Sequence, residues 1–154
     1  MKIARSGYDW FADLFCVLLL AGVFIYLAFG WKAIPEQIPG HYNAAGMIDG
    51  WTDKKELFVL PVIALIMYVG ITVLEQFPRI WNTGIRITKQ NARRVYRTLK
   101  NMIATIKWQM VLSFIVITLY SSLAKPLPSW FTALFLILIF GTLIGFFIRL
   151  FKVR

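Results

Sequence analysis

The chain has 154 residues, of which 59% are hydrophobic and 16% are charged, and its formal net charge is +10 at pH 7. A soluble domain of this size could not bury so much apolar surface, so an ordinary soluble fold is excluded and lipid is expected to cover that surface. The chain has one cysteine, Cys16, which excludes an internal disulfide and a cysteine-based metal site.

Four apolar stretches are long enough to cross a bilayer, which takes about 20 residues per helix. They cover residues 11–30, 57–74, 102–123 and 130–147. No polar linker or internal repeat divides the chain. The sequence therefore predicts an all-α, polytopic membrane protein with four transmembrane helices, built as a single membrane domain over residues 1–154.

Lysine and arginine predict the orientation of these helices. Twelve of them lie in the two termini and in segment 76–101, whereas four lie in segments 31–56 and 124–129. The positive-inside rule then places both termini in the cytoplasm and segment 31–56 outside it. A retained first helix is expected rather than a cleaved signal peptide, because its apolar run is long and no small-residue cleavage site follows it.

Segment 76–101 is basic and amphipathic. From Arg86 to Met102, apolar residues recur at spacings of three and four, which predicts a helix leading into the third span. One interpretation is a topology determinant that lies on anionic lipid headgroups. The other is a docking surface for a cytoplasmic protein. No nucleic acid is expected as a partner, because the basic residues cluster beside membrane spans.

Segment 31–56 is the longest connection and contains the only histidine, His41. Pro35 and Pro39 stiffen the chain, whereas Gly46 permits a turn with positive φ. Asn43, Asp49 and Asp53 are typical turn formers. We therefore expect a structured cap outside the membrane between the first two helices.

The run from Ile34 to Trp51 reads IPEQIPGHYNAAGMIDGW. It resembles a bacterial membrane domain of unknown function that occurs at the N-terminus of SdpI-like immunity proteins. The similarity extends from the first span to the start of the second. The resemblance implies a multi-pass protein of the bacterial cytoplasmic membrane, with these residues as the determinants of a ligand-binding cap: Pro35, Pro39, His41, Asn43, Gly46, Asp49 and Trp51.

His41 and Asp49 also allow a second hypothesis. Histidine and carboxylate side chains are metal ligands, and a His–Asp pair performs general acid–base chemistry. One histidine with scattered carboxylates is not a closed ligand set, however, and no nucleophile motif accompanies it. The alternative function is therefore a metal-dependent membrane enzyme that uses His41 and nearby carboxylates. In the competing interpretation, His41 and Asp49 form hydrogen bonds that fix the turns of the cap, and the sequence names no cofactor.

Two charged residues fall within predicted spans. Asp13 and Lys107 lie at similar depth near the cytoplasmic ends of the first and third spans. Charges inside a membrane usually pair with one another or line a path, so an ion pair is one hypothesis. The other is that each side chain reaches the interface separately. A proton-coupled pump is weakly supported, because no acidic residue lies deep within spans two to four.

The resemblance implies an accessory, immunity or sensing protein. Its expected partners are the lipid bilayer and a peptide toxin or envelope ligand bound by the outside cap. A cytoplasmic protein on the basic segment and a second copy of the chain are further candidates.

Overall fold

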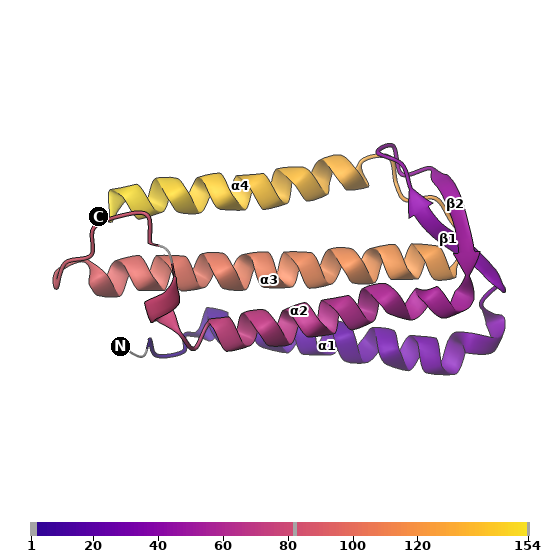
Figure 1. The fold of residues 1–154 in the computed structure, drawn as a ribbon, viewed down its shortest axis with the longest axis horizontal. Coiled ribbons are helices and arrows are strands. Elements are labelled where there is room, and N and C mark those ends of the chain that lie inside the picture. The colour runs from indigo at the N-terminus through magenta and orange to yellow at the C-terminus, as the bar shows by residue number, and fades with distance from the viewer. Residues whose placement is uncertain (1–2, 82, 154) are drawn as a thin grey trace.

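The computed structural model describes residues 3–81 and 83–153 and shows four long helices that run lengthwise through the molecule (Figure 1). They are α1 (Gly7–Gly30), α2 (Val59–Leu74), α3 (Ala92–Ser122) and α4 (Phe131–Lys152). With the short 3₁₀ turns that extend α1 and α2, all four are long and apolar enough to cross a membrane. The prediction of four candidate membrane spans is confirmed at this level.

The two ends of the bundle differ. The chain termini and the connection between α2 and α3 lie at one end, which we call the terminal end (Figure 1). The connections between α1 and α2 and between α3 and α4 lie at the other, which we call the hairpin end. Lys2 and Arg154, which contribute to the predicted orientation, lie outside the described residues.

The helix α3 is the centre of the bundle, because α1, α2 and α4 each pack against it. Its neighbours form the main apolar core with it. The α1 residues Cys16, Leu20, Val23 and Leu27 recur every three or four positions, so they share one helix face, and all are buried. By contrast, Leu150 is the buried residue of α4, whose other described side chains are at least partly exposed.

Helix boundaries differ from the predicted spans where polar residues extend the helices. The helix α1 begins at Gly7 rather than near residue 11, because Ser6 and Asp9 form a capping box. The helix α4 continues past residue 147 to Lys152. Arg149 and Lys152 lie in its last turn, where positive charge is favourable.

The amphipathic helix predicted from Arg86 to Met102 also differs from the observed helix α3. The helix begins at Ala92, so Arg86 and Lys89 precede it, and it continues without a break through the third span. Val95 and Leu99 are buried as the apolar pattern predicts. Lys100, which the pattern assigns to the exposed basic face, is also buried.

A β-hairpin in the connection between α1 and α2 corrects the all-α prediction. The strands β1 (Gln37–Tyr42) and β2 (Ile48–Asp53) pair in antiparallel fashion. The register joins Gln37 to Asp53 and Pro39 to Trp51, with irregularities around His41. The turn residues and an ordered cap were predicted from the sequence, but two prolines so close together did not indicate strand pairing.

Candidate functional site

The turn of the hairpin depends on two residues of the sequence motif. The Asn43 side chain accepts hydrogen bonds from the backbone N–H groups of Ala45 and Met47, at 2.9 and 3.1 Å. Gly46 has a φ of +81°, which glycine adopts without strain. A Cβ atom at this position would lie 2.6 Å from the carbonyl oxygen of Leu127. Asn43 and Gly46 therefore shape the hairpin and its contact with the connection between α3 and α4.

Three hydrogen bonds attach the hairpin to the far end of α3 and the connection that follows it. The Ser121 hydroxyl donates to the carbonyl oxygen of Pro39 at 2.5 Å, and the Leu127 N–H donates to that of Gly46 at 2.9 Å. The Tyr42 hydroxyl donates to the Lys125 carbonyl oxygen at 3.1 Å. Burial raises the pKa of this phenol to about 12, so it stays protonated at neutral pH. The hairpin is thus fixed to the bundle.

The outer face of the hairpin presents polar and aromatic side chains. Along β2, Asp49, Trp51 and Asp53 are exposed and alternate with half-buried residues. The Nδ1 atom of His41 lies 2.5 Å from Oδ1 of Asp49. Trp51 is 57% exposed. A titratable pair and an accessible indole therefore share one face.

The two prolines of the motif have different positions. Pro35 is exposed and precedes β1, whereas Pro39 is buried within β1 opposite Trp51. Because Pro39 has no N–H group, it offers the sheet only its carbonyl oxygen, which accepts from Ser121. These prolines, together with Asn43 and Gly46, thus shape the hairpin, whereas His41, Asp49 and Trp51 are available at its surface.

The carboxylates that could have completed a metal site have other partners. Glu36 pairs with Lys54 at 2.5 Å, and the Asp53 side chain accepts from the Lys55 N–H at 2.8 Å. Within residues 3–81 and 83–153, no three His, Cys, Asp or Glu side chains group in a way that could hold a metal ion. The structure brings together two members of the hypothetical ligand set, His41 and Asp49.

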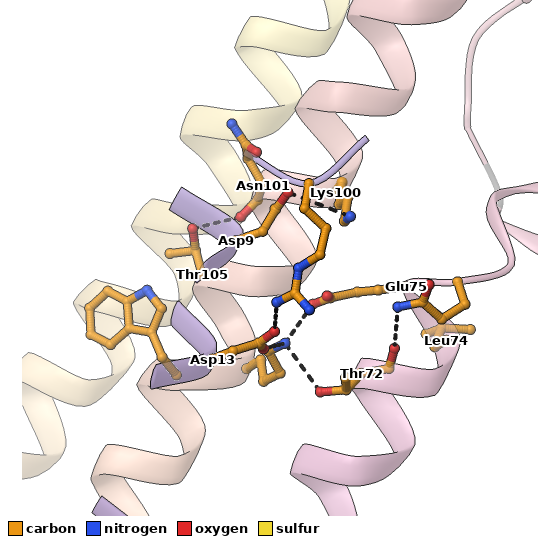
Figure 2. Close-up of polar contacts among 12 residues, drawn as sticks. Asp9, Asp13, Thr72, Leu74, Glu75, Lys100, Asn101 and Thr105 are labelled. Carbon is orange, nitrogen blue, oxygen red and sulfur yellow. Dashed lines mark hydrogen bonds and ion pairs between the residues drawn. The ribbon is translucent and has the colours of Figure 1, made fainter. Parts of the chain in front are cut away.

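A second polar site lies near the terminal end and joins α1, α2 and α3 (Figure 2). Lys107 of α3 is fully buried. Its Nζ atom lies 2.6 Å from Oδ1 of Asp13, 2.9 Å from Oε1 of Glu75 and 3.2 Å from the Thr72 hydroxyl. Asp13 also pairs with Arg5. A charge within the bundle is thus neutralised by acids from two other helices, as burial requires.

Asp9 forms the adjacent part of this site. Its Oδ2 atom lies 2.9 Å from Nη1 of Arg97 and 3.5 Å from Nζ of Lys100. The same oxygen accepts from the Ser6 N–H at 2.7 Å, which completes the capping box. We call the whole group the charge cluster, and it consists of Arg5, Asp9, Asp13, Glu75, Arg97, Lys100 and Lys107. It binds the start of α1 to the first half of α3.

An ion pair of Asp13 with Lys107 was one of two hypotheses from the sequence, and the other members of the cluster were not predicted. The sequence spacing of these charged residues could have predicted the larger cluster. Asp9 and Asp13 are four residues apart on α1, and Lys100 and Lys107 are seven apart on α3, so each pair shares a helix face. Two acids facing two lysines at matching depth indicate an extended cluster rather than a single pair.

Comparison with known families gives a match over part of the chain. Residues 18–65 match a family described as a domain of unknown function (DUF1648). The matched region contains the second half of α1, the whole hairpin and the first part of α2. Comparison with curated proteins and with solved structures found no match. The chain is therefore similar, over the segment that builds its hairpin end, to a domain family whose description assigns no activity.

Proposed function

We propose that this chain is an SdpI-like immunity or sensing protein of the bacterial cytoplasmic membrane. It binds a peptide toxin or another envelope ligand through the outer face of its hairpin, with both termini in the cytoplasm. The observation that carries this proposal is the exposed group of His41, Asp49 and Trp51 on a hairpin that is fixed to the bundle.

The rigidity of the hairpin favours recognition. Side chains on fixed elements lose less conformational freedom on binding than side chains on mobile loops, so more of the contact energy remains as affinity. Exposed tryptophan is also among the residues that contribute most to interfaces. The hairpin end combines both properties, since backbone hydrogen bonds hold β1 against β2 and Trp51 remains accessible.

The charge of this face indicates the kind of ligand. Asp49 and Asp53 are exposed beside Trp51. A cationic, amphipathic peptide would pair its basic residues with these carboxylates and its apolar residues with the indole. The family similarity supports the choice of the hairpin as the ligand site, because the matched residues 18–65 contain the complete hairpin.

The orientation in this proposal is supported by the charge distribution. The positive-inside rule assigns the lysine- and arginine-rich side to the cytoplasm. The two termini lie at the same end of the bundle, as an even number of membrane spans requires (Figure 1). The hairpin then faces the envelope, where a toxin from another cell would arrive.

A growth assay tests this function. Bacteria that lack the chain are challenged with a panel of cationic membrane-active peptides, with and without the wild-type protein. We expect protection against at least one peptide and loss of that protection when His41 and Trp51 are both replaced by alanine. The matched control is Lys55→Ala, an exposed change next to β2. Equal protection by the double variant, or no protection by the wild type, would overturn the proposal.

A further inference from the structure

A cavity of about 420 Å³ lies beneath the hairpin. Its volume is within the range of about 300–1,000 Å³ that is typical of small-molecule sites. Residues of α2 line it on one side and residues of α4 on the other, with α3 between them and β1 at its end. His41 contributes to its lining, but Asp49 and Trp51 of the outer face do not, so an inference about it does not rest on the proposed function.

The part of the cavity between the helices is apolar. Leu60 of α2, Ile117 of α3 and Phe135 of α4 contribute to this lining. Because α4 packs against α3 on one side, its remaining surface is exposed, including Leu134 and Ile137. The cavity is therefore bordered by helix faces that lipid covers in a membrane.

The part of the cavity next to the hairpin is polar. Thr52 of β2 and Glu56 of the following 3₁₀ turn lie in the lining, and Glu56 is exposed. No lysine or arginine contributes to the lining within the described residues. Lys54, close by in sequence, pairs with Glu36 at 2.5 Å. The polar part thus carries the Glu56 carboxylate and the His41 side chain, with no lysine or arginine beside them among the described lining residues.

A cavity that is apolar between the helices and polar next to the hairpin matches one kind of ligand. An acyl chain fits an apolar cavity that borders lipid, and an ammonium group is complementary to a carboxylate at its polar end. We propose that the cavity binds one acyl chain of a membrane phospholipid whose ammonium headgroup pairs with Glu56. An anionic phospholipid would place like charge beside this carboxylate and would bind less well.

Native mass spectrometry of the full chain in detergent tests the proposal. The delipidated protein is incubated with an equal mixture of dioleoyl-phosphatidylethanolamine, which carries an ammonium group, and dioleoyl-phosphatidylglycerol, which is anionic. We expect one bound lipid per chain, with a several-fold preference for the ammonium lipid. A preference for the anionic lipid would contradict the headgroup assignment. A dimer mass in place of lipid adducts would assign the cavity to a second copy and overturn the proposal.

Two substitutions on α4 form a matched pair for this measurement. Thr132 lines the cavity, whereas the neighbouring Ala133 is exposed and does not. Thr132→Trp should fill the cavity and lower lipid occupancy by about tenfold, whereas Ala133→Trp should leave it unchanged. Glu56→Gln should retain lipid but lose the headgroup preference. Equal occupancy in the two tryptophan variants would exclude the cavity as the site.

A second measurement keeps the proposal testable if Thr132→Trp does not fold. The wild-type protein is incubated with the ammonium lipid carrying a photoreactive diazirine at the end of one acyl chain. We expect labelling to concentrate on the α3 and α4 residues that line the cavity, above all Ile117 and Phe135. Labelling spread evenly over lipid-facing residues of α1 would show general bilayer contact instead.

Discussion

The two ends of the bundle are held together by different contacts. At the hairpin end, hydrogen bonds to backbone carbonyls attach the hairpin, with its exposed outer face, to α3 and to the connection that follows it. At the terminal end, buried charges from three helices pair with one another. A single hydrogen bond contributes about 0.5–1.5 kcal/mol, whereas breaking a buried ion pair costs about 3–5 kcal/mol. Folding should therefore depend most on the charge cluster, and recognition on the hairpin.

The largest expected effect is from Lys107→Met. This change leaves Asp13 and Glu75 without the buried cation between them and should lower the free energy of unfolding by about 3–5 kcal/mol. Thermal and denaturant unfolding in detergent measure the loss. Lys125→Met, at an exposed lysine, is the control and should change stability little.

A compensating variant distinguishes charge from packing. If uncompensated carboxylates cause the loss, adding Asp13→Asn and Glu75→Gln to Lys107→Met should restore much of the stability, because no buried carboxylate then lacks its cation and Arg5, which loses Asp13, is partly exposed. No recovery in the triple variant would show that the geometry of the lysine side chain, rather than charge balance, holds the three helices.

The next effect is from Gly46→Ala. The residue has a φ of +81°, and its new Cβ atom would meet the Leu127 carbonyl oxygen at 2.6 Å, so the hairpin must shift away from the connection after α3. We expect a loss of about 1–3 kcal/mol in unfolding free energy. Gly84→Ala is the matched control, because Gly84 also has positive φ but has open space around a Cβ atom. Equal losses would mean that backbone strain alone matters.

An effect of similar size is expected from Ser121→Ala. The change removes the donor to the buried Pro39 carbonyl oxygen and should cost about 1–3 kcal/mol, the penalty for an unsatisfied acceptor. The loss should be local, so hydrogen exchange should rise in β1 and β2 while the helices keep their protection. Unchanged exchange in the hairpin would contradict its attachment through Ser121.

The smallest effect on stability is expected from His41→Ala. The His41 and Asp49 side chains are largely exposed, and exposed pairs contribute about 0–1 kcal/mol. Thermal unfolding should therefore change little, whereas protection in the growth assay should fall. A large loss of stability would instead make the pair a structural part of the hairpin.

The sequence was most informative where one physical requirement dominates. Apolar length predicted the four spans, because a helix must cover the hydrocarbon layer. Matching depth made Asp13 and Lys107 candidate partners. The turn residues Asn43 and Gly46 were identified from the special conformations they adopt.

The sequence was less informative where packing between distant segments determines whether a residue is buried or paired. The helical pattern assigned Lys100 to the basic face, whereas its burial depends on α3 continuing unbroken and facing Asp9 of α1. Glu75 looked like an ordinary helix end until α2 was placed beside Lys107. The hairpin was missed because irregular pairing around His41 and a buried Pro39 obscure the strand pattern.

The central claim is that the hairpin faces the envelope. It is tested by labelling intact cells with a membrane-impermeant maleimide. Met47→Cys places a thiol on the exposed hairpin, Arg94→Cys places one near the terminal end, and the native Cys16 is buried in α1. We predict labelling of Met47→Cys in intact cells and of Arg94→Cys only after permeabilisation. The reverse pattern would place the hairpin in the cytoplasm and contradict the proposed function.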